Sequence, residues 1–145
     1  MRSFVVGLAV LGSLAACDST TANSNSSQLQ LAQHQAQWEH RSFHSYTYDY
    51  LNRALLGNAN VHVTVTADTV SSVINVDTGV PPEIPVSVPT IDGLFLYAHT
   101  VLGEKGATVI LEFDSQLGYP TRVSAFSNNP GGGYDATVSN LQPTS

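Results

Sequence analysis

The stretch Ser45-Tyr46-Thr47-Tyr48-Asp49-Tyr50 decides the fold, because it places a tyrosine at every second position. Successive side chains of a β-strand point to opposite faces, so this period of two predicts a strand with all three tyrosines on one face. Aromatic residues in that arrangement usually pack in the core against a helix, and Trp38 or Phe95 is the expected partner. The alternative is that Tyr46, Tyr48 and Tyr50 form a surface for a ligand or partner, because tyrosine is enriched at interfaces.

A second alternating stretch follows and predicts a β-hairpin. Val61–Thr66 alternates valine with polar residues, and Ala67-Asp68 supplies a tight turn. The returning strand then has one side formed by Val70, Ser72, Ile74 and Val76. After it, residues 80–89 carry four prolines and therefore cannot lie inside a sheet, so we expect a crossover loop there.

Two segments have the spacing of helices. Gln28–Glu39 is rich in Gln and Ala and places Leu31 and Trp38 seven residues apart on one helical face. In the second segment, Thr90 is the expected N-cap and Gly103 is placed to end the helix. The apolar stripe of this second helix consists of Ile91, Leu94, Phe95, Ala98, Val101 and Leu102.

Three more strands complete the predicted domain, at residues 108–113, 120–127 and 134–141. The element order is therefore α-β-β-β-α-β-β-β. Strands joined by hairpins and flanked by helices indicate an α+β domain. We expect an antiparallel sheet of about six strands with two helices packed on one face, which leaves the other face partly exposed to water.

The N-terminus has the pattern of a lipoprotein signal peptide. Arg2 is followed by an apolar run, Phe4–Leu14, that is well short of the roughly 20 residues of a membrane-spanning helix. The run ends in Leu14-Ala15-Ala16-Cys17, which looks like the bacterial lipobox. This pattern predicts a signal peptide over 1–16 and a lipid on Cys17, the alternative being an ordinary secretory signal.

The rest of the chain is then divided into a tether and a domain. The residues that follow Cys17, up to residue 27, are mostly Ser, Thr and Asn and include no large apolar residue. Residues 17–27 are therefore expected to form the lipidated cysteine and a flexible tether. Residues 28–145 are expected to form a single α+β domain. Two or three acyl chains on Cys17 would anchor the protein to a membrane, where one chain would not.

The charge of the chain excludes several functions. Without Arg2, four basic residues stand against eleven acidic ones, which is a net charge of −7. Nucleic acids and anionic lipid surfaces both attract clustered Lys and Arg, so neither is an expected partner, and the lipid alone would hold the protein to the membrane. With the only cysteine acylated, no disulfide, thiolate nucleophile or zinc–cysteine site is possible in the monomer.

No grouping of residues predicts a catalytic centre, a metal site or a cofactor. His40 and His44 have the spacing of a helical zinc motif, but the segment between them lacks a glutamate and leads into a strand. Glu112 and Asp114 share a strand face, where a solvated edge is a simpler interpretation than a weak calcium site or an acid/base pair. Asp92 is explained by the dipole of the second helix, and no Gly-x-Ser-x-Gly sequence is present.

Three short motifs resemble a bacterial lipoprotein family known as domain of unknown function 6174. They are Trp38 followed by Tyr46-Thr47-Tyr48, then Thr90-Ile91-Asp92-Gly93-Leu94-Phe95, then Gly118-Tyr119-Pro120-Thr121-Arg122. Members commonly carry a cysteine pair where this chain has Leu51-Asn52-Arg53, and acidic residues where it has Asn129–Gly133. The resemblance implies the fold and the envelope location, but no activity.

Together these observations predict a lipid-anchored bacterial envelope protein that faces the periplasm or the cell exterior. We expect a non-catalytic binding or accessory module whose partner is an envelope protein or a small ligand. The alternative is a cell-envelope hydrolase with a carboxylate pair, in which Asp92, Glu112 or Asp114 would have to converge. A purely structural envelope component is a third hypothesis.

Lipidation is directly testable. A Cys17→Ala variant should move from the detergent phase to the aqueous phase of a detergent partition, because it loses the acyl chains that hold the protein in the membrane. Western blotting of both phases measures the change. Retention of the variant in the detergent phase would refute the lipid anchor.

Overall fold

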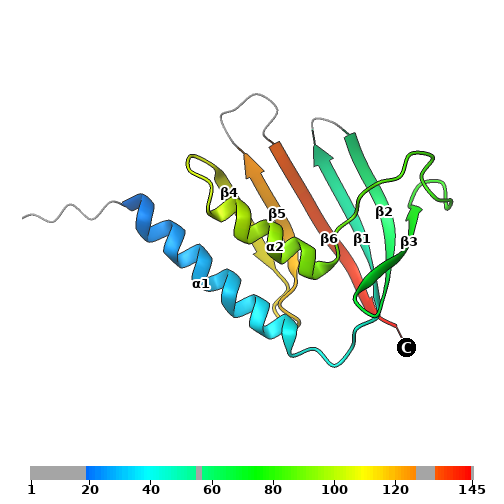
Figure 1. Ribbon diagram of the computed structural model, residues 1–145, viewed down its shortest axis with the longest axis horizontal. Helices are drawn as coiled ribbons and strands as arrows, with labels where there is room; N and C mark the ends of the chain where they lie inside the picture. The colour runs from blue at the N-terminus through cyan, green and yellow to red at the C-terminus, as the bar shows by residue number, and fades with distance from the viewer. Residues whose placement is uncertain (1–18, 55–56, 127–132, 145) are drawn as a thin grey trace, which may run out of the picture.

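Six strands form one antiparallel sheet, and two helices lie on one of its faces (Figure 1). The computed structural model describes residues 19–54, 57–126 and 133–144. The α+β class and the predicted order of elements are both confirmed. The elements are α1 (Ser19–Glu39), β1 (Tyr46–Ala54), β2 (Gly57–Thr66), β3 (Thr69–Asn75), α2 (Ile91–Leu102), β4 (Thr108–Phe113), β5 (Pro120–Phe126) and β6 (Gly133–Pro143).

The strand order is β3-β2-β1-β6-β5-β4, so each group of three consecutive strands forms a block of neighbours. The two blocks meet where β1 pairs with β6, the first strand with the last, in a register that sets Tyr50 opposite Val138. The pairing shifts between Thr47 and Asp49, and the partner strand accommodates the irregularity with Asn140 at a φ of 54°. Asparagine is one of the few residues that adopts this left-handed conformation at modest cost.

The hydrophobic core lies between the helices and the face of the sheet that they cover. Trp38 of α1 is at its centre, with the rings of Phe43, Tyr46 and Tyr119 at its edge, at centroid distances of 5.9, 5.5 and 6.1 Å. Edge-to-face contacts of this kind stabilise a core beyond the area that they bury. The other fully buried large side chains are Leu31, Tyr48, Tyr50, Val61, Val63, Val65, Ile91, Leu94, Phe95 and Val123.

The predicted turn at Ala67-Asp68 is confirmed and has positive φ at both residues, 47° and 60°. Two left-handed residues give a turn whose twist matches that of the flanking strands. Neither residue is a glycine, so the conformation carries a cost. Hydrogen bonds from the Ala67 amide to Ser45 Oγ (3.1 Å) and from the Asp68 amide to the His44 carbonyl (2.8 Å) help to offset it.

The returning strand differs from the expectation in one respect. A bulge between Thr64 and Val65 turns Val70 toward the covered face, opposite Val65, while Ser72 and Ile74 face the other way. The four residues expected on one side therefore do not share a side, and β3 ends at Asn75, before Val76. A bulge adds one residue to one strand, which the alternation of residue types does not reveal.

Both ends of α2 lie where the sequence predicts them. The Thr90 hydroxyl oxygen accepts a hydrogen bond from the Gly93 amide at 3.2 Å, as an N-cap should. Gly103 follows the last helical residue, and its amide donates to the Thr100 carbonyl. Gly103 has right-handed backbone angles. In the connection that follows, Gly106 is the residue with a positive φ.

The first helix begins earlier than expected. It starts at Ser19 rather than Gln28, so residues 19–27, which were predicted to belong to a flexible tether, are helical. Ser, Thr and Asn have low helix propensity, which suggested a later start. Extending an existing helix costs less than nucleating one, so the helix packed at Leu31 and Trp38 can continue through them. The predicted signal peptide and Cys17 lie outside the described residues, within which no helix is long and apolar enough to cross a membrane.

A glycine in the β4–β5 turn allows α1 to pack closely. Gly118 has a φ of +80°, and a Cβ atom added there would lie 2.5 Å from the His34 carbonyl oxygen and 2.9 Å from Gln37 Cβ. Gln37 Nε2 donates to the carbonyls of Ser115 and Gln116 in the same turn, at 3.2 and 2.7 Å. The turn and the helix therefore fit together only without a side chain at this position.

We predict that Gly118→Ala lowers the free energy of unfolding by about 3 kcal/mol, because it adds a backbone clash to the cost of a left-handed alanine. Gly79→Ala is the matched control, since Gly79 also has a positive φ, of 71°, but an added Cβ meets nothing within 4 Å. It should cost about 1 kcal/mol. Urea denaturation measures both values, and equal losses would show that the close contact with α1 is unimportant.

Candidate functional site

The three tyrosines of β1 belong to the core. The exposed fractions of Tyr46, Tyr48 and Tyr50 are 0%, 0% and 1%, and the hydroxyls of Tyr46 and Tyr48 reach Ile91 and Pro89 at the start of α2. The interpretation of these residues as a ligand or partner surface is therefore wrong, and the core interpretation is correct. The pattern identified the shared face but not which face the helices cover.

The hydroxyl groups of these tyrosines are hydrogen-bonded. The Tyr46 hydroxyl oxygen accepts from the Ile91 amide at 3.2 Å, and the Tyr48 hydroxyl donates to the Pro89 carbonyl. Both contacts lie at the start of α2. Burial is the main reason why the pKa of Tyr46 rises to about 12. These side chains stay neutral at physiological pH and serve as anchors for the helix.

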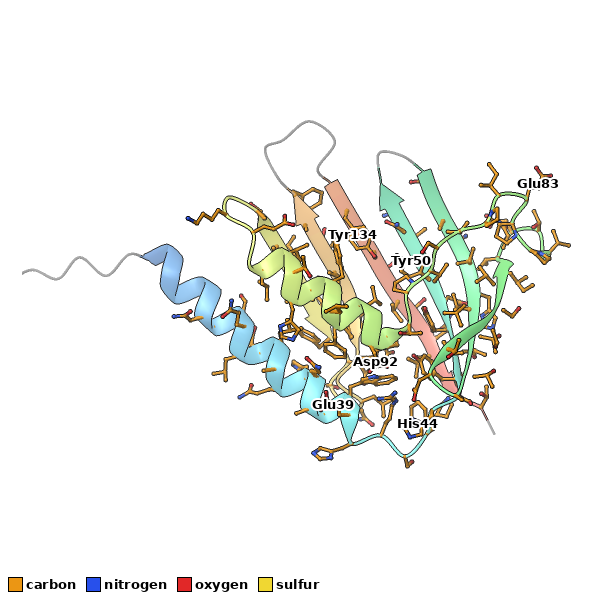
Figure 2. All side chains as sticks on the ribbon, in the orientation of Figure 1. Glu39, His44, Tyr50, Glu83, Asp92 and Tyr134 are labelled. Atoms are coloured by element: carbon orange, nitrogen blue, oxygen red, sulfur yellow. The ribbon has the colours of Figure 1, made fainter. Side chains whose placement is uncertain are left out.

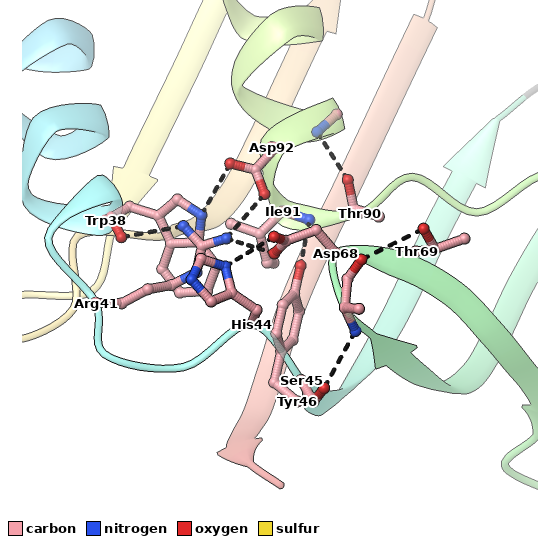
Figure 3. Close-up of polar contacts among 12 residues, drawn as sticks. Trp38, Arg41, His44, Ser45, Tyr46, Asp68, Thr69, Thr90, Ile91 and Asp92 are labelled. Carbon is pink, nitrogen blue, oxygen red and sulfur yellow. Dashed lines mark hydrogen bonds and ion pairs between the residues drawn. The ribbon is translucent and has the colours of Figure 1, made fainter. Parts of the chain in front are cut away.

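A cluster centred on Arg41 joins four segments at one end of the sheet (Figure 3). The Arg41 side chain is 6% exposed, and its guanidinium lies 4.2 Å from the centroid of the Trp38 ring. Its Nη2 contacts Asp68 at 2.7 Å and Asp92 at 3.3 Å, and Trp38 Nε1 donates to Asp92 at 3.2 Å. His44 Nδ1 lies 2.7 Å from the other Asp68 oxygen. The cluster connects the end of α1, the α1–β1 connection, the start of α2 and the β2–β3 turn.

The carboxylates of the hydrolase hypothesis have separate partners. Asp92 belongs to the Arg41 cluster, and Glu112 lies 3.8 Å from Arg122. Asp114 accepts hydrogen bonds from the amides of Gln116 and Leu117, at 2.9 and 2.7 Å, within its own turn. A shift of register between Glu112 and Phe113 also interrupts the strand face on which Glu112 and Asp114 were placed. The structure does not bring these groups together.

The histidines are also dispersed. His34 stacks on Phe113 at 4.2 Å, and His99 Nε2 contacts Gln35 of α1 at 2.8 Å. His44 contacts Asp68 rather than joining His40 in a metal site. Within the described ranges, no group of three or more His, Cys, Asp or Glu side chains could hold a metal ion.

The sheet face opposite the helices is left uncovered by both of them, and we call it the open face (Figure 1). The residues on the open face follow from the strand registers and the alternation of side chains along each strand. A partly solvated second face was the sequence prediction. The open face consists of Thr47, Asp49, Leu51 and Arg53 on β1, Asn60, His62 and Thr64 on β2, Ser72 and Ile74 on β3, Ile110 and Glu112 on β4, Arg122 and Ser124 on β5, and Asp135, Thr137 and Ser139 on β6.

Charges of alternating sign cross four neighbouring strands of the open face. This charge ladder runs from Glu112 through Arg122 and Asp135 to Arg53. Arg122 Nε donates to Asp135 at 2.9 Å, and Arg53 is opposite Asp135 in the β1–β6 register. The hydrogen bond from Arg122 is the main cause that holds the pKa of Asp135 below its ordinary value, and the charge of Arg53 acts in the same direction.

A second polar group lies on the open face, around Asp49. Asn140 Nδ2 donates to one carboxylate oxygen at 2.7 Å, and His62 Nδ1 lies 2.7 Å from the other. Partial burial works to raise the pKa of Asp49, but these hydrogen bonds outweigh it, and the pKa lies below the ordinary value. Sequence reasoning missed both polar groups, because each depends on which strands are neighbours.

Two pockets lie elsewhere, at the C-terminal end of α2. One has a volume of about 90 Å³ and is lined by residues of α2, of the α2–β4 connection, of β5 and of β6. The other is a groove of about 630 Å³ between Ser27 of α1 and residues 101–109. They share Val101, Glu104 and Ala107, so they adjoin each other.

The fold and the site define a one-sided antiparallel α+β domain with a polar, charge-paired open face. Residues 30–141 match a family of unknown function, DUF6174, and the chain belongs to that family. The family resemblance carried by the three sequence motifs is thus confirmed. No curated protein and no solved structure matches the chain.

The charge ladder predicts a dependence of stability on pH. The folded-state pKa of Asp135 is lowered, so its contribution is present above the unfolded-state pKa of about 3.9 and is lost as the pH falls through the folded-state value. Asp135→Asn should therefore be less stable than wild type at pH 7, and the difference should shrink between pH 4 and pH 2. Urea denaturation at several pH values measures this.

Glu83→Gln is the control for this experiment, because it removes one negative charge from an exposed loop far from the ladder (Figure 2). A stability difference between Asp135→Asn and wild type that stays constant down to pH 2 would contradict the assigned role of Arg122.

Proposed function

We propose that the protein is a lipid-anchored envelope protein and a non-catalytic binding or accessory module, which meets a protein partner through its open face. The lipobox-like Leu14-Ala15-Ala16-Cys17 supports the anchor and the envelope location. The first described helix begins at Ser19, so little chain separates Cys17 from the folded part. The open face carries the proposal, because it is the broad surface that the helices leave uncovered.

The dimensions of the open face suit a protein partner. Six strands spaced about 4.8 Å apart span about 24 Å, and strands of this length extend for about 25 Å, which gives an area of roughly 600 Å². A specific interface of standard size buries about 800 Å² on each partner. The open face with its bordering loops is therefore of the right order for a moderately sized interface.

The charges of the open face favour recognition of a specific protein. In the charge ladder, opposite signs alternate and Arg122 is held by Asp135, so the pattern is fixed before a partner arrives. Preorganised charges of both signs contribute to specificity and orientation more than to affinity. A single-sign basic surface, which nucleic acid requires, is absent from the described strands of this face.

The hydrolase alternative loses its support. It requires carboxylates that converge on one reacting bond, and Asp92, Glu112 and Asp114 each have different partners.

Site-specific photocrosslinking in cells tests the proposal. A photoreactive residue at Thr137 on the open face should give a discrete crosslinked species, and one at Leu96, which is 70% exposed on α2, should not. Adding Glu112→Arg to the Thr137 probe should strongly reduce the crosslink, because it places a positive charge beside Arg122.

Circular dichroism of each variant checks that the fold is kept. Equal crosslinking yields from probes at Leu96 and Thr137 would refute the open face as the binding surface. So would a Thr137 crosslinking yield that Glu112→Arg leaves unchanged.

A further inference from the structure

The outer edge of β4 carries backbone groups that the fold does not use. β4 is the last strand of the sheet, and among the described strands its neighbour is β5, on one side. In an edge strand, every second residue directs its amide and its carbonyl away from the sheet. β4 therefore presents a row of hydrogen-bond donors and acceptors on the side where the described part of the chain supplies no strand.

The sequence of β4 lacks the features that usually keep an edge strand from pairing. Its residues, Thr-Val-Ile-Leu-Glu-Phe, include no proline, glycine or lysine. The register with β5 is regular from Thr108 to Glu112 and shifts only after that. At the other edge of the sheet, a bulge interrupts the pairing of β3 with β2. Bulges, prolines and lysines commonly protect edge strands, so β4 is the better template for an added strand.

A groove separates α1 from the start of β4. Its volume is about 630 Å³, and it is lined by Ser27 of α1 and by residues 101–109, which include the first two residues of β4. At the other end of the strand, the rings of His34 and Phe113 stack at 4.2 Å and join α1 to β4. α1 therefore accompanies β4 along its length (Figure 1), and the groove leaves space beside the start of the strand.

The two faces of β4 define the side chains that suit a segment paired with it. Val109 and Leu111 are half-buried on the helix side of the sheet, so the residues beside them should be apolar. On the open face, Ile110 is 39% exposed. The Glu112 side chain is 58% exposed and lies 3.8 Å from Arg122. A carboxylate that is exposed and loosely paired favours a basic residue on the neighbouring strand.

The charges around the groove also favour a basic segment. Glu104 lines the groove, and the negative end of the α2 dipole lies at Leu102, which lines it too. Lys105 opposes them with one positive charge. The whole chain has eleven acidic residues against five basic ones. Charge complementarity therefore points to a partner segment with Lys or Arg rather than Asp or Glu.

A second copy of this chain suits the edge less well than a different protein. β4 contains no basic residue that could lie beside Glu112 of another copy. Two chains with the same excess of acidic residues also repel each other. The charges thus select a foreign, basic segment.

We propose that the edge of β4 and the adjoining groove bind an extended segment of a partner protein by β-strand addition. Apolar residues of that segment lie on the helix side, and they alternate with polar residues that include Lys or Arg near Glu112. Main-chain hydrogen bonds to β4 supply affinity, and the alternate side chains supply selectivity. The site is separate from the open face and does not rest on the function proposed for that face.

A library of peptides serves as the first probe, because the edge selects a pattern rather than one sequence. Random ten-residue peptides displayed on phage are selected on purified Cys17→Ala protein. Enriched peptides should alternate apolar and polar residues, with Lys or Arg in the polar set. A synthetic copy of the most enriched peptide should bind with a dissociation constant of about 10–100 μM. No enrichment, or enriched peptides without this alternation, would overturn the proposal.

Hydrogen exchange measured by NMR locates the bound peptide. Amides of β4 that exchange freely in the unbound protein should be protected about tenfold or more in the complex, and amides of β3 should not change. Protection confined to β3, or to the open face around Thr137, would overturn the proposal. Protection of β4 that grows with protein concentration without peptide would assign the edge to a second copy, and would overturn it as well.

N-methylated peptides test main-chain pairing directly. Neighbouring residues of a strand direct their amides to opposite sides, so of two peptides methylated at adjacent positions, one loses a hydrogen bond to β4 and the other does not. The first should bind about three- to tenfold more weakly than the parent peptide, and the second within about twofold of it. Equal losses at both positions would contradict strand addition.

A pair of charge variants tests the basic residue. Glu112→Gln should weaken binding of the selected peptide about two- to fivefold, the range of an opposite-charge pair across two strands. Glu83→Gln removes the same charge from an exposed loop and should leave binding unchanged. Equal affinities of the two variants would refute the contact with Glu112. Failure at the β4 edge leaves the Thr137 crosslinking result untouched, so the two proposals can be refuted separately.

Discussion

Buried hydroxyl groups must find hydrogen-bond partners, and this constraint on the tyrosines of β1 organises the rest of the structure. Tyr46 and Tyr48 find their partners in the backbone at the start of α2, at Ile91 and Pro89. The first amides of a helix also lack partners within the helix, so the Tyr46 contact satisfies both requirements at once. Because the start of α2 is fixed to β1 in this way and the rest of the helix packs on β4 and β5, the helix stays on this face of the sheet and the opposite face stays open.

Local physics made most of the fold predictable. The period of two in β1, the turn at Ala67-Asp68 and the Thr90 cap each depend on residues close together in the chain. The start of α1 at Ser19 was missed because weak helix formers can extend a helix that packing has already nucleated. The charge ladder was missed because it depends on which strands are neighbours, such as β1 with Arg53 and β6 with Asp135, and no local pattern specifies this.

The open face and the pocket use the two sides of the same strands. On β6, Tyr134 points into the pocket and its neighbour Asp135 belongs to the charge ladder. On β1, Tyr50 holds Tyr134 while Asp49 and Arg53 face the other way. The alternation of side chains therefore lets one rigid sheet present two chemically different surfaces, and a substitution on one side need not disturb the other.

A helical α1 changes what an anchor at Cys17 would impose on the domain. A flexible tether would let the domain adopt any orientation, whereas a helix of 21 residues is about 30 Å long and projects in one direction. Ser27 lines the groove beside the pocket, and Ser19 lies eight residues, or about 12 Å, farther along the same helix. A lipid on Cys17 would thus hold the pocket end of the molecule nearer to the bilayer than the Arg41 cluster at the other end of α1. The open face, on the opposite side of the sheet from α1, would then remain accessible to a protein.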